Sequence, residues 1–518
     1  MNNHTLHYLD YIVIVITLFI ALFYGKYFSK KQTSTDAYYA GGRNLPPWAV
    51  GISILATLIS SITFLAYPGE GFKSNWILLV QAIMVVVVLS GLVWFVVPLY
   101  RKVIGISAYE YFEKRFGPFA RFYSSAAFTL THFSKMGSVF FLLALALSSM
   151  TGVNTYLIIW VVGFVIIYIA LKGGMEAIVW LDVLQGFMLI GGGLISIIII
   201  LFSVNGGPAA IINYAVEHDK IGFGPYDWDL TKLTFIVMVF NGIFYGIQKY
   251  GTDQTIVQRY LTTKTEKGAI KAALTGVFLS LPVWALFMFI GTALYSYYNL
   301  SGETLPANIN PDAVFPYFIM TRLPPGVTGL VLSALLAAAI SSLDADLNCL
   351  SAIAVDDYYA RFKPQSSDSQ RLRFGRIIIL ISGIAALLIA SLYVFTGSEG
   401  VLGIVFGLYA IFSGGIAGIF LLGIFSRHAN KHGLYTAIVV CILFTAYAVL
   451  TSTKINGSRV LDLGEWNFRH HSYMLGVYTH LIIIVVGYFA SFFFKSDVPH
   501  SDLTIYAWWE KMRNNRKQ

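Results

Sequence analysis

The sequence predicts an all-α protein that crosses a membrane many times. Hydrophobic residues make up 57% of the 518 residues and charged residues only 12%, and the mean hydropathy is +0.69. Apolar runs of the roughly 20 residues that a helix needs to cross a hydrocarbon core recur along the whole chain. These observations exclude an ordinary soluble globular protein, whose composition is far more polar.

Thirteen apolar runs are long enough to form such helices. The first lacks a preceding Lys or Arg and a small-residue cleavage site, which favours a retained helix over a signal peptide. No soluble domain fits between the runs. The expected spans are residues 9–28, 48–67, 76–99, 122–150, 153–171, 176–204, 233–253, 269–298, 325–352, 376–396, 399–425, 433–451 and 473–494.

The distribution of basic residues predicts the orientation. If the N-terminus lies outside, the inner segments hold 26 of the 35 Lys and Arg residues and the outer segments hold 7. The positive-inside rule then places the C-terminus in the cytoplasm. The expected location is the plasma (inner) membrane. Orientation explains the net charge of +9 better than nucleic-acid binding, because the basic residues are spread over seven short inner segments. The other two, Lys135 and Lys249, fall inside spans.

Motifs for other classes of protein are missing from the sequence. Cys349 and Cys441 both lie in apolar spans, so we expect no disulfide framework and no metal centre built on them. The chain has no nucleotide-binding glycine loop and no HExxH motif, so an ion gradient is a better energy source than ATP, and we expect no organic cofactor. His132 stands alone in its span, and we interpret it as a core residue of a protein that is not an enzyme.

The stretch AAAISSLDADLNCL, residues 337–350, places two acids in an apolar span. An acid at the bilayer centre costs on the order of 2.5 to 3.5 kcal/mol, so it normally faces a cavity, a partner or an ion. Ala338, Ser341 and Ser342 stand at i, i+3 and i+4, so a carbonyl and two hydroxyls can converge and bind an alkali cation. Alternatively, the serines bond to the preceding turn and the acids pair at the membrane surface, where Asp346 is nearer the inner end than Asp344.

Five motifs along the chain resemble those of the sodium/solute symporter family, which includes sodium/glucose and sialic acid symporters. The resemblance covers almost the whole chain and implies a LeuT-like core of two inverted five-helix repeats, with one extra N-terminal and two extra C-terminal helices. The motifs are AGGRNLPPWAVGISILATLISSITFLAYPGEG, ISAYEYFEKRFG, AIVWLDVLQGFMLIGGG, YGTDQTIVQRYLTTK and AAAISSLDADLN.

The resemblance also implies domain boundaries. The first core helix contains ILATLISSIT, whose hydroxyls and β-branched residues allow local unwinding, although no Pro or Gly enforces it and a continuous helix is the alternative. The expected parts are an extra helix and inner loop at 1–47, the first repeat at 48–204, an outer loop at 205–232, the second repeat at 233–426, and two helices with a cytoplasmic tail at 427–518.

Two sodium sites follow from the resemblance. The main one joins the carbonyls of Ala56, Ile59 and Ala338 to the hydroxyls of Ser341 and Ser342.

A possible second sodium site uses Asp182, Asp344 and Ser341. It departs from the family pattern, because the expected hydroxyl positions after Ser342 are Asp344 and Ala345. The two carboxylates would strengthen a cation site, or they would share a proton or pair with a lysine.

The solute site departs from the pattern of sugar-transporting relatives. Their polar positions in the first core helix are occupied by Leu58, Ile62 and Thr63 here. Ser60 and Thr63 instead match the pattern of sialic acid carriers, with Gln81 as an amide partner. Each of these polar residues has helix packing as its alternative role.

Lys135 lies too deep in its span to reach the surface easily. It either receives a carboxylate of the solute or forms a permanent salt bridge with Asp182, Asp344 or Asp346. Sialic acid carriers use Arg in the corresponding helix, and Lys cannot reproduce its bidentate fork.

An inner gate is expected at Gln248, Lys249 and Tyr250, near the end of the seventh span. The alternative for Lys249 is that its side chain extends to the headgroups of the inner leaflet.

The sequence therefore predicts a sodium-coupled symporter that works by alternating access. Its solute is expected to be carbohydrate-like, either a sugar acid such as sialic acid or a neutral sugar or polyol. The alternatives are a sensor acting with a partner protein and a symporter of a non-sugar solute such as a vitamin or a monocarboxylate. We expect the bilayer, sodium and a small solute as partners, no nucleic acid, and function as a monomer.

Overall fold

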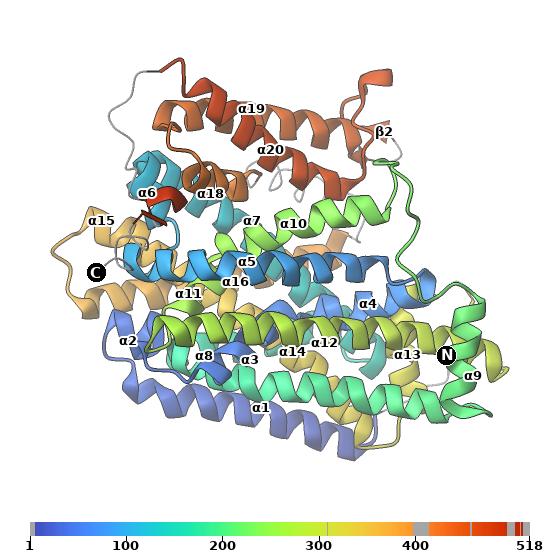
Figure 1. Cartoon of the computed structure of the whole chain (residues 1–518). Helices are drawn as coiled ribbons and strands as arrows, with labels where there is room; N and C mark the ends of the chain where they lie inside the picture. The colour runs from blue at the N-terminus through green and yellow to red at the C-terminus, as the bar shows by residue number, and fades with distance from the viewer. Residues whose placement is uncertain are drawn as a thin grey trace.

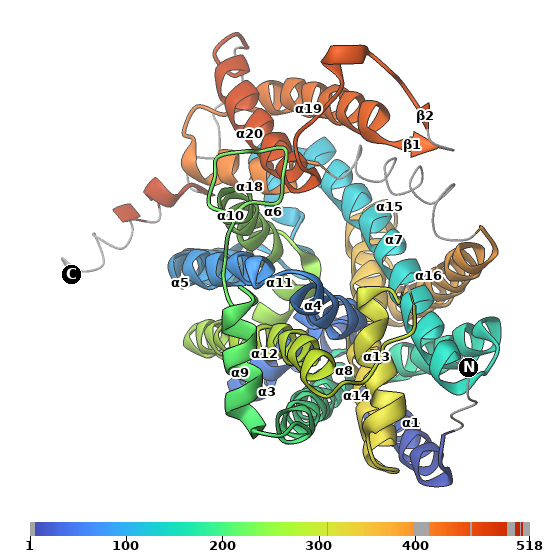
Figure 2. The same ribbon diagram turned by 90° about the vertical axis from the view of Figure 1, so that its right-hand side faces the viewer.

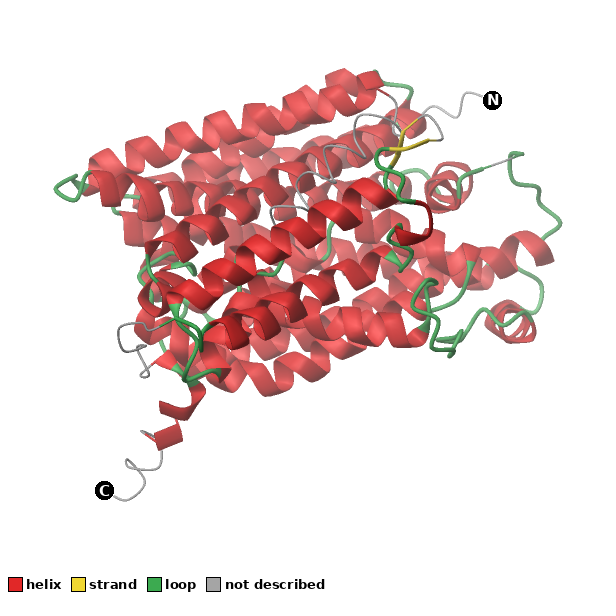
Figure 3. Cartoon of the chain, turned by 90° about the horizontal axis from the view of Figure 1, so that it is seen from above, coloured by secondary structure: helices red, strands yellow, loops and turns green. Residues whose placement is uncertain are grey.

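The computed structural model describes residues 6–307, 309–396, 414–455, 458–494, 503–507 and 509–510. Helices dominate this part of the chain, and a single pair of short strands accompanies them (Figure 3). The all-α prediction is therefore confirmed. Within the described residues, nine helices are long and apolar enough to cross a membrane, and a bent pair makes a tenth crossing if it counts as one.

The described residues contain fewer separate membrane-crossing helices than the thirteen spans expected, for three reasons. Helix α8 (Thr155–Phe202) contains two expected spans and is broken at Gly174, whose φ of 60° suits glycine. Helices α10 (Phe235–Gly251) and α18 (Ile416–Phe425) are shorter than a full crossing. The beginning of the expected span 399–425 lies outside the described residues. The number thirteen stays a prediction.

The remaining long helices agree with the expected spans to within several residues. They are α1 (Tyr8–Phe28), α5 (Ile77–Val103), α7 (Pro118–Thr151), α12 (Glu266–Leu300), α14 (Val327–Ile353), α16 (Asp368–Thr396), α19 (Lys431–Ser452) and α20 (Ser472–Ala490).

Short helices gather at the two ends of the bundle. At its left end in Figure 1 lie α2 (Thr35–Ala40), α6 (Glu110–Phe116) and α15 (Ala360–Phe362), and at its right end lie α9 (Gly207–Glu217) and α13 (Pro311–Arg322). We call the left end the basic end, because its connections carry most of the basic residues. The remaining elements are η1 (Ser29–Lys31), η2 (Gly41–Arg43), η3 (Ala354–Tyr359), η4 (Gly464–Trp466), β1 (Lys454–Ile455) and β2 (Ser458–Arg459).

Helix α14 is the centre of the molecule. Most of its residues are fully buried, and it packs against α8, α7, α3 and α16. By contrast, α1 lies at one edge of the bundle and the α19–α20 pair at the opposite edge, in both views (Figures 1 and 2). The acids of α14 therefore lie inside protein, and not in lipid.

Two helices are interrupted in the middle of the bundle. Helix α3 (Pro47–Leu58) is followed by α4 (Ser61–Lys73) after a bend of 58°, with extended backbone at Ile59 and Ser60. Helix α10 is followed by α11 (Gln254–Tyr260), and Thr252 and Asp253 form the connection. The expected unwinding of the first core helix is confirmed, and the alternative of a continuous helix is wrong. Each break leaves backbone carbonyls that no helical N–H satisfies.

Candidate functional site

The break after α3 lies against the serine pair of α14. Ser341 Oγ donates hydrogen bonds to the Ala56 carbonyl at 3.0 Å and to the Ala338 carbonyl at 3.2 Å. The Ala56 carbonyl is available because α3 ends two residues later. The structure thus brings three of the five expected sodium ligands together.

The other two expected ligands belong to the same pair of elements. Ser342 Oγ is buried and has no hydrogen-bond partner in the described part of the chain. Ile59 lies in the break itself, where its N–H donates to Leu55 and its carbonyl follows an extended backbone. A buried hydroxyl without a partner, next to carbonyls outside a helix, suits a small cation that prefers oxygen ligands.

Asp182 forms a buried ion pair that the sequence analysis did not anticipate. Its Oδ2 accepts from Arg259 Nη2 at 2.9 Å and from Ser53 Oγ at 2.5 Å, and Arg259 Nε also donates to Ser53 at 2.8 Å. Arg259 follows the expected span 233–253 in the sequence, yet its side chain is completely buried. The guanidinium of Arg259 already balances the negative charge of Asp182. A second cation bound to Asp182 would therefore share this carboxylate with Arg259.

Asp344 lies in the same region without a partner. It is completely buried, and neither carboxylate oxygen accepts a hydrogen bond from a side chain of the described residues. A buried ionised carboxylate without compensation is costly, so this group requires a cation or a proton. Of the two acids among the three residues expected at the second sodium site, Asp344 is therefore the one that remains uncompensated.

Asp346 belongs to a different cluster. Its Oδ1 lies 2.8 Å from His132 Nδ1, and its Oδ2 lies 3.0 Å from Lys135 Nζ. The idea that Asp346 lies at the membrane surface is wrong, because the residue is completely buried in the centre of α14. Lys135 therefore forms the salt bridge that was expected as one of its two roles, and its partner is Asp346. The Lys135 side chain is nevertheless 26% exposed, in contrast to that of Asp346.

His132 connects this cluster to the expected inner gate. It stacks on Phe128 with 3.7 Å between ring centroids, and its Nε2 lies 3.6 Å from Asp253 Oδ2. Lys249 Nζ contacts the same Asp253 oxygen at 2.7 Å and Thr255 Oγ1 at 3.2 Å. The interpretation of His132 as a packed core residue is confirmed.

Lys249 does not extend to the headgroups. Its side chain is only 11% exposed and pairs with Asp253, so the alternative role for Lys249 is wrong. Tyr250 beside it is completely buried, and the Gln248 carbonyl accepts from the N–H groups of Thr252 and Asp253 at the break. The three expected gate residues therefore form the end of α10, where the helix is interrupted.

The expected solute contacts lie in the first interrupted helix, on α5 and, for Lys135, on α7. Ser60 lies in the first break, and Thr63 is 6% exposed on the first turn of α4. Gln81 on α5 accepts a hydrogen bond from Asn241 Nδ2 of α10 at 2.9 Å. Sequence reasoning missed Asn241, Arg259 and Asp253, which lie in or next to the interrupted second helix. Their roles depend on contacts with other helices, which no spacing within the sequence reveals.

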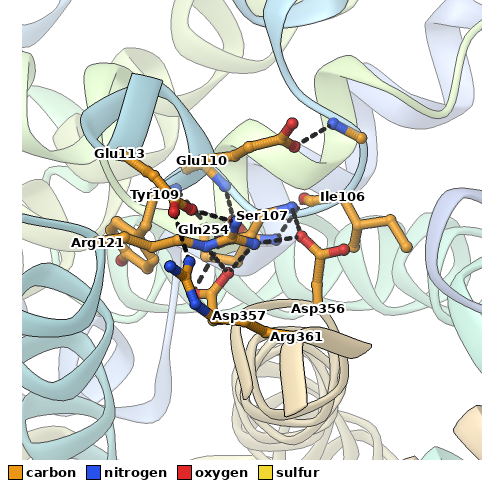
Figure 4. A network of polar contacts seen from close by, with 12 residues as sticks. Ile106, Ser107, Tyr109, Glu110, Glu113, Arg121, Gln254, Asp356, Asp357 and Arg361 are labelled. Atoms are coloured by element: carbon orange, nitrogen blue, oxygen red, sulfur yellow. Dashed lines mark hydrogen bonds and ion pairs between the residues drawn. The ribbon is translucent and has the colours of Figure 1, made fainter. Parts of the chain in front are cut away.

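A second cluster of ion pairs lies at the basic end of the bundle (Figure 4). Arg121 of α7 binds Asp357 through Nε at 2.7 Å, Asp356 through Nη2 at 2.9 Å and Glu113 of α6 through Nη1 at 2.8 Å. Arg361 also pairs with Glu113. Burial raises the pKa of Glu113, but the hydrogen bonds and charges of Arg121 and Arg361 outweigh burial and hold this pKa below its usual value. The cluster thus ties α6 and α7 to the end of α14.

Comparison with known proteins supports the arrangement. The model of the sodium:solute symporter family matches residues 38–441. The sodium/sialic acid symporter of Aliivibrio fischeri is 31% identical over 96% of this chain and 95% of its own length. That of Proteus mirabilis is 33% identical over 86% of this chain and 90% of its own length. A structure described as the substrate-bound outward-open state of a Na⁺-coupled sialic acid symporter, with a novel Na⁺ site, is similar with a TM-score of 0.86 at 30% identity, covering 94% of this chain and 98% of the other.

Proposed function

The chain belongs to the sodium:solute symporter family, and from this premise we propose that it imports a sugar acid such as sialic acid together with sodium. The observation that carries the choice of solute is Lys135, a lysine within the bundle whose side chain is partly exposed. The similarity to two sodium/sialic acid symporters supports the same choice.

Sodium would be bound where α3 and α14 meet. The ligands proposed are the carbonyls of Ala56, Ile59 and Ala338 and the hydroxyls of Ser341 and Ser342. Because α3 belongs to the first repeat and α14 to the second, the ion would hold the two halves in the conformation that accepts the solute. Its release on the other side would loosen that joint and allow the core to open inward.

The solute would lie between Lys135 and the break after α3. Lys135 would donate to the carboxylate of the solute, while Ser60, Thr63 and Gln81 would donate to or accept from its hydroxyl and amide groups. Asp346, which also contacts His132, holds the Lys135 side chain in place, and Lys135 retains a donor because an ammonium has three. On the way out, the solute would pass Gln248, Lys249 and Tyr250, whose opening requires the Lys249–Asp253 contact to separate.

We also propose that the protein lies in the plasma (inner) membrane as a monomer, with its N-terminus outside. The location of most basic residues at one end of the bundle supports this orientation.

A neutral sugar or polyol is the second candidate solute. The observation that favours it is the ion pair itself, because an ammonium balanced by Asp346 has less need of a second carboxylate.

Isothermal titration calorimetry of the purified protein decides between the two solutes. N-acetylneuraminic acid and glucose are titrated separately, each in sodium chloride and in choline chloride. We expect heat of binding only for the acid and only in sodium. Tight sodium-dependent binding of glucose without competition by the acid would exclude the proposal and make Lys135 a structural residue.

A further inference from the structure

A groove at the basic end of the bundle has no part in the proposed transport path. It lies where the segment after α1, the first half of α8 and the start of α16 meet, and its volume is about 490 Å³. The residues at its polar end are Gln32, Thr33, Ser369, Arg373 and Arg376.

Two neighbouring arginines supply the positive charge of the groove. Arg373 and Arg376 are three residues apart on α16, so their side chains leave the same side of the helix. Both are exposed, and neither has a carboxylate partner among the residues that the structure describes. Arg376 is oriented by Tyr38, whose ring centroid lies 5.9 Å from the guanidinium carbon. Two neighbouring guanidinium groups without a counter-ion form a site for an anion with several oxygens.

The rest of the groove is apolar and continues along the membrane-facing side of α16. Its lining there includes Leu171, Ile377 and Leu380, of which Ile377 is 48% and Leu380 is 42% exposed. Ile381, the next residue, is 57% exposed. Leu380 follows Arg376 by one helical turn, about 6 Å along the axis. The cationic and the apolar halves are thus adjacent, which is the arrangement that a charged headgroup joined to an acyl chain requires.

We propose that this groove binds an anionic phospholipid. The phosphate would lie against Arg373 and Arg376, the polar headgroup would face Thr33 and Ser369, and an acyl chain would lie along Ile377 and Leu380. A soluble anion would use only the cationic half, and the headgroup of a zwitterionic lipid would bring a positive charge of its own to the two arginines. Basic pockets between membrane helices are known to bind acidic headgroups.

Such a lipid would connect parts of the chain that are distant in sequence. It would contact the segment after the extra helix α1, the first repeat through α8 and the second repeat through α16. Because it binds the folded protein, it would stabilise the assembly of these three elements, by an amount that rises with the logarithm of its concentration above the dissociation constant.

The test is native mass spectrometry of the delipidated full-length protein in detergent. Dioleoyl phosphatidylglycerol and dioleoyl phosphatidylcholine are titrated separately, and the thermal unfolding midpoint is recorded in parallel. We expect tighter binding and a larger rise in midpoint with phosphatidylglycerol. The double variant Arg373→Gln, Arg376→Gln is expected to bind phosphatidylglycerol about tenfold more weakly, since each basic group near a headgroup contributes appreciably. The matched control Lys264→Gln, Lys363→Gln removes the same charge from exposed positions at the same end and is expected to bind as the native protein does.

Three results would overturn the proposal. They are equal binding of the two lipids, an unchanged affinity of the double variant for phosphatidylglycerol, and a rise in midpoint with inorganic phosphate that abolishes the effect of the lipid. The last result would assign the groove to a soluble anion. Should the double variant fail to fold, the single substitution Arg373→Gln, with Lys363→Gln as its control, is measured in the same way.

Discussion

Lys135 of α7 and Asp346 of α14 are 211 residues apart in the sequence and form an ion pair with 3.0 Å between Nζ and Oδ2. His132, one turn before Lys135, binds the other oxygen of the same carboxylate. Asp346 therefore positions the ammonium of a side chain that is partly exposed, and the proposed role of this ammonium is to receive an acidic solute.

Replacement of Lys135 by Ala should abolish sodium-dependent binding of N-acetylneuraminic acid, because the ammonium that receives its carboxylate is lost. Lys135→Arg should retain part of the binding, since the positive charge remains. Isothermal titration calorimetry in sodium chloride measures the binding of the acid to both variants. Lys264→Ala, which removes an exposed ammonium at the basic end, is the control. Unchanged affinity in Lys135→Ala would exclude contact between Lys135 and the solute.

Ser342→Ala should raise the sodium concentration that gives half-maximal uptake by about tenfold, because one oxygen ligand of the ion is lost. Uptake into proteoliposomes at varied external sodium provides the measurement. Ser333→Ala is the matched control, since Ser333 is a buried serine on the same helix whose hydroxyl also has no partner in the described residues. The ion assignment is wrong if uptake proceeds equally with choline and responds to a proton gradient instead.

Asp344→Asn tests whether a second cation binds. If Asp182 and Asp344 hold it together, the Hill coefficient for sodium should fall toward one in this variant, because the carboxylate that lacks a partner is neutralised. Sodium dependence of uptake gives the coefficient. Asp182→Asn should lower it as well, and it should also destabilise the protein, since Arg259 would be left as a buried charge without a partner. Native cooperativity in both variants would reject the second site.

Glu113→Gln should lower the free energy of unfolding by about 1 kcal/mol at neutral pH, because hydrogen bonds to Arg121 and Arg361 are weakened. The pKa of Glu113 is lower in the folded than in the unfolded protein. Its contribution is therefore complete above the ordinary pKa of glutamate, about 4.3, and is lost as the pH falls below that value. Thermal unfolding in detergent between pH 7 and pH 3 should show the native protein and the variant converging. Glu217→Gln, at an exposed position on α9, should show no difference at any pH, and a constant difference for Glu113→Gln would contradict the assignment.

The sequence predicted what depends on local spacing. The apolar runs gave the helices, and the i, i+3, i+4 pattern of Ala338, Ser341 and Ser342 placed oxygens on one side of α14, where Ser341 now contacts Ala338 and Ala56. The partners across the bundle could not be found in this way. Arg259 pairs with an acid 77 residues earlier, and no periodicity within one helix relates the two positions.

The alternatives that the structure rejects for Asp346 and Lys249 have a common basis. Both residues lie near the end of an apolar run, and an ionisable residue at such a place normally reaches the membrane surface. Here the interruption between α10 and α11 places Asp253 within 2.7 Å of Lys249, and α7 supplies two partners to Asp346. The location of each charged group therefore depends on a partner from another part of the fold. It does not depend on how close the residue lies to the end of its apolar run.

The lack of a partner for Asp344 has an electrical consequence. In the centre of the bundle the three basic side chains of Lys135, Lys249 and Arg259 face four acids, namely Asp182, Asp253, Asp344 and Asp346. One monovalent cation would make this set neutral. If that cation is a single sodium ion carried with a singly charged acid, the cargo has no net charge, and the membrane voltage neither drives nor opposes its passage. A second sodium ion would add one positive charge to each cycle, and a voltage of 100 mV, negative inside, would then contribute about 2.3 kcal/mol to accumulation of the solute.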